Sequence, residues 1–329
     1  MKPIHVALLG LGTVGEGVYQ TIQTHQDRLQ QVTGRPVHIS AILIEHPDKY
    51  THLDKEITIT TDIQTILQNP DIDVVFEAIV GIEPAFSYLK QCIIAGKSII
   101  TANKEMFARH GFELKQLAQK HDTTLGYDAT TAGGIPIIQT IQQLLQVNQI
   151  HKIQGILNGT SNYILTEMRE QHTSFEIALE QAQTLGYAEA DPTNDIEGYD
   201  ALYKLMILSE LTFGEQPDWA DIKRIGISDI SAADLANSQT AEEKIKHIAT
   251  IQQIEGKLHA AVEPISVTTT HPLYAIEGVD NAVYIETDLI GNLTLTGPGA
   301  GALPTASAML EDFCTLFSKK ISTINKVLA

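Results

Sequence analysis

The chain has 329 residues, 43% of them hydrophobic, and a formal net charge of −18. A chain of this length and composition can bury a sizeable core, and we expect about two domains. The acidic balance argues against nucleic acid or an anionic membrane as a partner, and no apolar run approaches the roughly 20 residues of a membrane span. The N-terminal apolar run is too short for a signal peptide. Cys92 and Cys314 lie far apart, which predicts a reducing compartment, the cytoplasm.

The first predicted element is a strand from Ile4 to Leu9, whose nearly continuous apolar run is typical of burial on both faces. It leads directly into a glycine-rich turn and then a helical stretch from about Val14 to Val32. In that context, small residues let the backbone approach a pyrophosphate at the start of a helix. The alternative is a merely tight strand-to-helix turn. The predicted dinucleotide-binding residues are Gly10, Gly12, Thr13, Val14 and Gly15.

The second predicted strand, Val37 to Ile44, ends at an acidic residue, Glu45. A carboxylate there would accept hydrogen bonds from the adenosine ribose and repel a 2′-phosphate, which favours NAD over NADP. His46 and Lys49 are close in sequence and could hold a phosphate instead, and a solvent-facing Glu45 would also leave NADP open.

Strand-like and helix-like segments then alternate, which predicts an α/β fold with a parallel sheet covered by helices on both sides. The strands are expected at 73–79, 98–102 and 123–129, and the helices at 84–95 and 104–120. Ligands bind beyond the carboxyl ends of such strands. Val80, Thr101, Asn103 and Lys104 follow two of these ends, so we expect them near the nicotinamide. Lys104 opposes the dipole of its helix, which favours a functional role over an ordinary exposed lysine.

The second half opens with a predicted domain exit at 127–138, where two glycines precede a helix with an early proline. A strand at 152–157 ends in Asn158-Gly159-Thr160, a turn rich in backbone and hydroxyl donors. Thr173 and Glu176 have the spacing of a capping box, and Gly186 is the expected end of the helix that follows.

An acidic stretch, 185–204, comes next. It reads as a loop with Asp195 as the N-cap of a helix on which Asp200 and Lys204, four residues apart, share one face. Taken alone, it would be a solvated acidic loop with one surface ion pair.

The remainder predicts mostly strands, with a closing helix from Ala302 to Ser318. A glycine-rich turn at 297–301 precedes that helix and is either a ligand-binding turn or a simple loop. None of the 12 histidines has metal-ligand spacing, and no Ser-His-Asp or Cys-His arrangement is present. The expected strands are 245–254, 258–267, 282–287 and 293–296.

Seven motifs in this order resemble the homoserine dehydrogenase family over essentially the whole chain. They are GLGTVG at 10–15, ITANKEMFA at 100–108, AGGIPII at 132–138, GILNGTSNYIL at 155–165, LGYAEADP at 185–192, GYDALYK at 198–204 and GPGAGALPTASAM at 297–309. The resemblance implies a Rossmann-type, doubly wound domain at 1–135, completed by the closing helix 302–329. It also implies an inserted α+β catalytic and dimerisation domain at 136–301, and a homodimer or higher homo-oligomer.

The activity that the resemblance implies is interconversion of L-homoserine and L-aspartate 4-semialdehyde with NAD or NADP, on the branch leading to threonine, methionine and isoleucine. Lys204 would be the acid/base, with Asp200 and Lys104 beside it, since aldehyde reduction needs a proton at the developing alkoxide. The implied substrate ligands are Glu189, Asp195, Asp200, Lys104, Gly159, Thr160 and Gly186. Gly299 and Ala300 join the implied cofactor ligands.

The resemblance also implies a monovalent cation, sodium or potassium, held by the segment from Asp128 to Ile135, with Thr131 and Gly133 as further ligands. Four positions depart from the family pattern. Glu45 stands where relatives usually carry arginine, and Val80 where they carry glycine. Asp128 stands where they carry glutamate, and Thr131 where they commonly carry valine. The chain also stops about where the closing helix ends, so we expect no C-terminal regulatory domain. Two alternatives stay open: a catalytically weak NAD(P)-binding paralogue that acts as a sensor, and a dehydrogenase of another small amino-acid alcohol.

Overall fold

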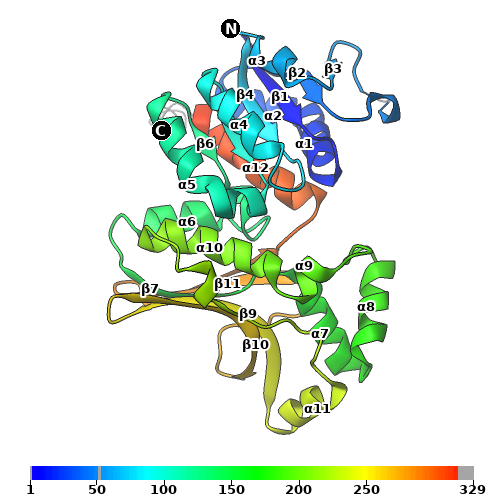
Figure 1. Ribbon diagram of the computed structural model, residues 1–329, viewed down its shortest axis with the longest axis vertical. Coiled ribbons are helices and arrows are strands. Elements are labelled where there is room, and N and C mark those ends of the chain that lie inside the picture. The colour runs from blue at the N-terminus through cyan, green and yellow to red at the C-terminus, as the bar shows by residue number, and fades with distance from the viewer. Residues whose placement is uncertain (1, 51–52, 318–329) are drawn as a thin grey trace, which may run out of the picture. The chain divides into compact units, whose positions relative to one another are not determined.

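The computed structural model describes residues 2–50 and 53–317 and divides into two compact units (Figure 1). Unit 1 comprises Met1–Thr130 and Gly301–Ala329, and unit 2 comprises Thr131–Ala300. The chain therefore leaves unit 1, builds unit 2 as one continuous segment, and returns to unit 1 with its last helix. None of the described helices is long and apolar enough to cross a membrane.

Unit 1 is built on a six-stranded sheet in the order β3-β2-β1-β4-β5-β6, with every neighbouring pair parallel. This order reverses direction beside β1, and such a point is where doubly wound sheets bind ligands. The predicted α/β fold class is confirmed. The strands are β1 (Ile4–Leu9), β2 (Val37–Leu43), β3 (Thr58–Thr60), β4 (Ile72–Glu77), β5 (Ser98–Thr101) and β6 (Leu125–Gly126).

The helices of unit 1 bury apolar stripes against this sheet. The last helix, α12, packs on α1 so closely that a Cβ on Gly17 would lie 2.5 Å from the Ala302 carbonyl oxygen. One core joins both ends of the chain, because Phe313 of α12 lies against Phe76 of β4. The helices are α1 (Thr13–Thr24), α2 (Gln26–Thr33), α3 (Ile63–Leu67), α4 (Ala85–Ile94), α5 (Lys104–Lys120) and α12 (Ala302–Phe317).

Two predictions in unit 1 were wrong in detail. The helix expected from Val14 to Val32 is broken at His25, whose ψ of 25° ends α1, and Gln26 then ties α2 to the sheet by donating to the Val37 carbonyl at 2.9 Å. The strand expected at 123–129 is only two residues long, because only Ile99 and Ile100 of β5 pair with it. The expected closing helix, Ala302–Ser318, is seen to Phe317, and residues 318–329 lie outside the described part of the chain.

Unit 2 is built on a second six-stranded sheet in the order β12-β11-β7-β9-β10-β8. Its pairs are antiparallel except for β8, which runs parallel to β10. A two-residue turn, Glu255-Gly256, joins β9 to β10, with both residues at positive φ as the twist of a tight hairpin requires. The strands are β7 (Ile150–Ile156), β8 (Lys223–Arg224), β9 (Glu243–Ile254), β10 (Lys257–Thr268), β11 (Asp280–Thr287) and β12 (Asn292–Pro298).

Helices cover one face of this sheet, with α6 and α10 lying along it in Figure 1. Leu205 and Leu208 of α10 are fully buried. A helix in the stretch expected to be mostly strands, α11, was missed; Ser231 and Asp234 form a capping box at its start. The helices are α6 (Ile137–Leu144), α7 (Gly159–Gln171), α8 (Phe175–Thr184), α9 (Thr193–Ile196), α10 (Tyr199–Phe213) and α11 (Ala232–Thr240).

Two capping predictions in unit 2 were also wrong. Ser174, not Thr173, is the N-cap of α8, and no side-chain hydrogen bond caps this helix. Asp195 is not the N-cap of α10, because it lies inside the short helix α9. Gly198, at φ 80°, redirects the chain into α10, and this left-handed conformation is one that glycine adopts without strain.

Candidate active site

The glycine-rich turn of unit 1 has the geometry of a dinucleotide cradle. A Cβ on Gly10 would lie 2.9 Å from the Ala78 carbonyl oxygen, and one on Gly15 would lie 2.2 Å from that of Gly10, so both positions exclude larger residues. A Cβ on Gly12 would meet nothing within 4 Å. Gly12 and Thr13 are exposed at the N-terminus of α1, where amide donors and the helix dipole favour a phosphate. These observations fit a nicotinamide dinucleotide.

The other predicted cofactor residues of unit 1 lie at the carboxyl edge of its sheet. Glu45 is exposed just beyond β2, and Lys49, whose side chain is outside the described atoms, is near it in sequence. Val80, beyond β4, is 95% exposed. Thr101 ends β5, and Asn103 caps α5 by accepting the Met106 N–H at 3.1 Å. Lys104 is the first residue of α5 and is half-buried.

In unit 2, the start of α7 and the helices α9 and α10 bring four polar side chains together. Lys204 Nζ donates to Asp200 Oδ2 at 2.7 Å, as their spacing predicted, and both side chains are buried. The Asn158 amide joins two carboxylates, donating to Asp200 Oδ2 at 2.8 Å and to Asp195 Oδ1 at 2.7 Å. We call Asn158, Asp195, Asp200 and Lys204 the aspartate–lysine site.

Burial changes how the acidic stretch must be interpreted. Lys204 is only 5% exposed and also donates to the Leu157 carbonyl at 2.6 Å, at the end of β7. A solvated loop with a surface ion pair would leave this lysine in water, so that simpler interpretation is excluded for the 200–204 end. A lysine held by a carboxylate and a carbonyl has a fixed ammonium that can give a proton to, or take one from, an oxygen placed against it.

The remaining predicted substrate residues of unit 2 divide into two groups. Gly159 and Thr160 begin α7 beside Asn158; Thr160 donates to the Tyr187 carbonyl, and a Cβ on Gly159 would lie 2.6 Å from the Val279 carbonyl oxygen. Gly186 ends its helix at φ 77° and is exposed, as is Glu189. The Glu189 backbone carbonyl accepts a hydrogen bond from Gln183, while its carboxylate faces solvent.

The predicted cofactor residues Gly299 and Ala300 follow β12. Gly299 is buried against Asn281, and a Cβ there would lie about 2 Å from the Asn281 side chain, so packing within unit 2 is enough to require glycine. Ala300 is exposed. A ligand-binding role for this turn stays a prediction.

The described residues contain no group of three or more His, Cys, Asp or Glu side chains that could hold a metal ion. The predicted monovalent cation site is of a different kind, with one carboxylate and backbone carbonyls. Asp128 and Thr131 are fully buried, and Gly133 and Ile135 are buried too. The site stays a prediction.

Two polar residues at these sites were not predicted from the sequence. Asn158 was seen only as part of a turn, although an asparagine before a helix is a common cap whose amide can face a site. Glu77 was taken as part of a strand, yet it is a fully buried carboxyl at the ligand-binding edge of unit 1. Its position as the last residue of an apolar strand was the available signal.

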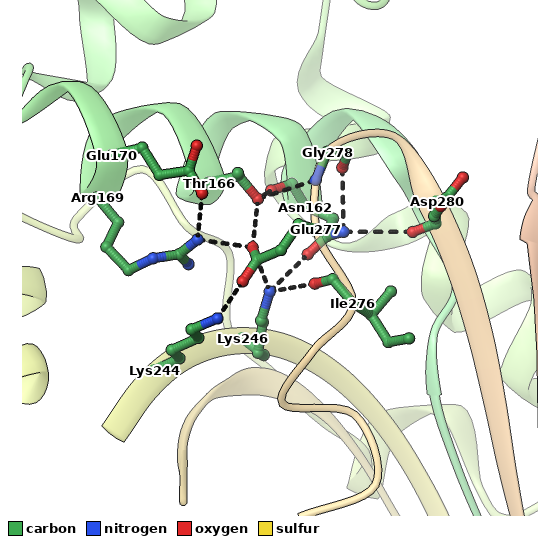
Figure 2. Close-up of polar contacts among 10 residues, drawn as sticks. All are labelled: Asn162, Thr166, Arg169, Glu170, Lys244, Lys246, Ile276, Glu277, Gly278 and Asp280. Atoms are coloured by element: carbon green, nitrogen blue, oxygen red, sulfur yellow. Dashed lines mark hydrogen bonds and ion pairs between the residues drawn. The ribbon is translucent and has the colours of Figure 1, made fainter. Parts of the chain in front are cut away.

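A second buried ionic group lies farther along α7 (Figure 2). The Glu277 carboxylate accepts hydrogen bonds from Arg169 Nη2 at 2.7 Å, from Lys246 Nζ at 2.9 Å and from Lys244. Although burial alone would raise the pKa of Glu277, these cations lower it to about 2. Burial lowers the pKa of Lys246 to about 8. We call Arg169, Lys244, Lys246 and Glu277 the Glu277 cluster.

A doubly wound sheet with a dinucleotide cradle, together with a buried lysine that can exchange a proton, defines a nicotinamide-dependent oxidoreductase. Comparison with known proteins gives the family. Residues 10–128 match the family model "Homoserine dehydrogenase, NAD binding domain", and residues 136–314 match the model "Homoserine dehydrogenase". The chain belongs to the homoserine dehydrogenase family, whose members are NAD(P)-dependent oxidoreductases.

Individual relatives agree with this assignment. The homoserine dehydrogenase of Bacillus subtilis is 41% identical over 314 residues, which are 95% of this chain and 72% of that protein. A crystal structure of a homoserine dehydrogenase from Thiobacillus denitrificans superposes with a TM-score of 0.92 at 37% identity, covering 98% of this chain and 74% of that one. A hyperthermophilic archaeal homoserine dehydrogenase solved in complex with NADPH gives 0.81 at 26% identity, covering 96% and 98%.

Proposed function

We propose that this chain interconverts L-homoserine and L-aspartate 4-semialdehyde with a nicotinamide cofactor, and that Lys204 is its acid/base. The observation that carries the proposal is the aspartate–lysine site, in which a buried lysine is fixed by Asp200 and by the Leu157 carbonyl. A bound nicotinamide cofactor would exchange a hydride with the carbon that bears the substrate hydroxyl. Lys204 would take the hydroxyl proton in oxidation and return it in reduction.

The charges of the aspartate–lysine site suit an amino-acid substrate. Two carboxylates and one ammonium sum to −1, and L-homoserine carries an α-ammonium that a negative site attracts. Asp195 and Glu189 would bind this ammonium, with Asp200 holding Lys204. The backbone of Gly159 and Thr160, at the N-terminus of the 13-residue helix α7, would favour the α-carboxylate. Lys104 would be a further cation for this carboxylate, and Gly186 would leave space for the substrate.

For the cofactor, we propose that NAD is preferred to NADP. Glu45 is exposed just beyond β2, where a carboxylate accepts ribose hydroxyls and repels a 2′-phosphate. The archaeal relative was solved in complex with NADPH. The proposal also includes a monovalent cation bound through Asp128, a homo-oligomeric enzyme, and a cytoplasmic location.

The direct test is a reaction of the purified protein with L-homoserine, following reduced cofactor, with NAD and NADP in parallel. We expect turnover with L-homoserine, an aldehyde product that a carbonyl reagent traps, and a larger kcat/KM with NAD. D-Homoserine is the matched control, because it has the same groups with the ammonium and carboxylate misplaced.

The outcomes separate the alternatives. Tight cofactor binding without turnover of any substrate would indicate a sensor. Faster turnover of L-serine or another small amino-acid alcohol than of L-homoserine would indicate a different dehydrogenase. Turnover that strongly favours NADP would contradict the role given to Glu45, and a monomer in light scattering would contradict the oligomeric state.

A further inference from the structure

Glu77 is a buried carboxyl that none of the roles above uses. It is the last residue of β4 and is 0% exposed. Its Oε2 accepts a hydrogen bond from the Thr101 hydroxyl of β5 at 2.5 Å, and its Oε1 accepts the N–H of Ile79 at 2.7 Å. One side chain thus joins the carboxyl ends of two neighbouring strands to the turn that follows the first of them.

Asn103 holds the same turn from its other side. Its Nδ2 donates to the carbonyls of Ile79 and Gly81, at 2.9 and 2.6 Å. Ile79 is therefore fixed through both its N–H and its carbonyl, and Gly81, at φ 87°, is fixed as well. Val80 lies between these two anchored residues and is almost completely exposed. An exposed apolar side chain on a rigid turn is suited to packing against a flat ring.

Among the described residues, those that hydrogen-bond to Glu77 are uncharged. It is faced by Leu9 of β1, by Thr101 of β5 and by Asn103 at the start of α5. The charged residues nearest in sequence are Asp73, four residues before it on β4, and Asp71 and Glu83, each six residues away. Burial raises the pKa of Glu77 to about 7, although hydrogen bonds from Thr101, Ile79 and Asn103 oppose the rise. An ion buried without a counter-ion is costly, and such groups concentrate at functional sites.

We propose that Glu77 is a positioning residue for the nicotinamide half of the cofactor. The ionised carboxylate fixes the 79–81 turn and the Thr101 hydroxyl at the edge where a doubly wound sheet binds its ligand. This inference rests on cofactor binding, which belongs to the proposed function. It assigns to this chain a residue that acts through the turn and Thr101 and does not itself touch the substrate.

Protonation of Glu77 removes one of these anchors. A proton on Oε2 makes that oxygen a donor to Thr101 Oγ1, which already accepts the Asn103 N–H at 3.0 Å, so the Thr101 hydroxyl hydrogen loses its acceptor. The turn is then held less firmly and Val80 is misplaced. Cofactor affinity should fall as the pH drops through about 7, because only the ionised form holds both donors.

The test measures the Kd of NADH, by its fluorescence and without substrate, from pH 6 to pH 8.5. For a group of pKa about 7, roughly a tenth is ionised at pH 6, so we expect the Kd of the unaltered protein to be about tenfold higher at pH 6 than at pH 8. Glu77→Gln cannot ionise, and its Kd at pH 8 should be at least tenfold higher than that of the unaltered protein and independent of pH. Glu83→Gln removes a nearby acid outside this network and should keep the full pH dependence.

Thr101→Val supplies a second measurement, the midpoint of the pH profile of the NADH Kd, which would not change if Glu77 were purely structural. It removes a hydrogen bond that lowers the pKa of Glu77, so the midpoint of the pH profile should shift to higher pH. Glu77→Gln with the affinity and pH profile of the unaltered protein would overturn the inference, as would a weakened variant that keeps the pH dependence. Cofactor binding without homoserine oxidation would contradict only the proposed reaction. Absence of cofactor binding would contradict both the proposed reaction and the role of Glu77.

Discussion

The aspartate–lysine site and the Glu277 cluster lie at opposite ends of one helix, α7, and have opposite charge balances. In the aspartate–lysine site, two carboxylates share the Asn158 amide, and one of them, Asp200, also pairs with Lys204. In the Glu277 cluster, one carboxylate forms ion pairs with three cations, all of them side chains of the same chain (Figure 2). A partly buried carboxylate that accepts hydrogen bonds from three cations of its own chain holds elements together. A negative site with a fixed lysine suits an ammonium ligand and a proton transfer.

Burial of charge alone therefore does not identify a catalytic site. Lys246 and Lys204 are both buried lysines paired with a carboxylate. What distinguishes them is the number of partners competing for that carboxylate and the elements they join. Lys246 and Arg169 connect β9 and α7 to the loop before β11, so we expect changes there to alter stability more than turnover.

The largest expected effect is therefore on stability. Glu277→Ala leaves two lysines and a buried arginine facing one another, and breaking a buried ion pair by removing one partner costs about 3–5 kcal/mol. Denaturant unfolding followed by circular dichroism measures the loss. The exposed ion pair Lys90–Glu113 supplies the control, since Glu113→Ala should change stability by less than about 1 kcal/mol. Equal losses in the two variants would contradict the structural role of the Glu277 cluster.

The second effect is on turnover. Lys204→Ala removes the proposed proton donor, and kcat should fall by two orders of magnitude or more, about 2.7 kcal/mol of barrier. Lys246→Met is the matched variant, a buried lysine paired with a carboxylate outside the site, and its folded fraction should keep a kcat within a few-fold of normal. A near-normal kcat in Lys204→Ala would move the acid/base role to Lys104.

A third effect, in acid, sharpens the same distinction. The pKa of Glu277 is about 2 in the folded protein, well below its ordinary value, because three cations outweigh its burial. A lowered folded-state pKa contributes stability that is present above the ordinary pKa of a glutamate and is lost as the pH falls toward 2. We expect this part to be about 2 kcal/mol after allowance for the side chain's 27% exposure. In urea unfolding, the difference in free energy of unfolding between the unaltered protein and Glu277→Gln should become smaller from pH 5 to pH 2. A difference that does not change with pH would contradict the assigned pKa.

Much of this organisation could be predicted from the sequence where the physical signal was local. The apolar run of β1, the glycine turn after it and the four-residue spacing of Asp200 and Lys204 each depend on neighbours in the chain. The break at His25 and the two-residue length of β6 depend instead on hydrogen bonds to strands that are distant in sequence. The Glu277 cluster unites α7, β9 and a loop more than 100 residues from α7, which no local pattern could indicate.

The smallest effect that we predict concerns Asn158, which the sequence did not mark as a site residue. Its Oδ1 caps α7 through the Ser161 N–H at 2.8 Å, while its Nδ2 holds Asp195 and Asp200. Asn158→Ala should lower stability by about 1 kcal/mol, as losing a helix cap does.

Asn158→Ala should also raise KM for L-homoserine more than it lowers kcat, since the two carboxylates lose their alignment while Lys204 keeps Asp200. Asn158→Ser keeps a capping oxygen but cannot reach both carboxylates, so it should restore most of the stability and little of the KM. The same pair of measurements on Asn162→Ala, one turn along α7 toward the Glu277 cluster, should show a stability loss with KM unchanged. If Asn162→Ala raised KM as much as Asn158→Ala, the two ends of α7 would not be functionally distinct.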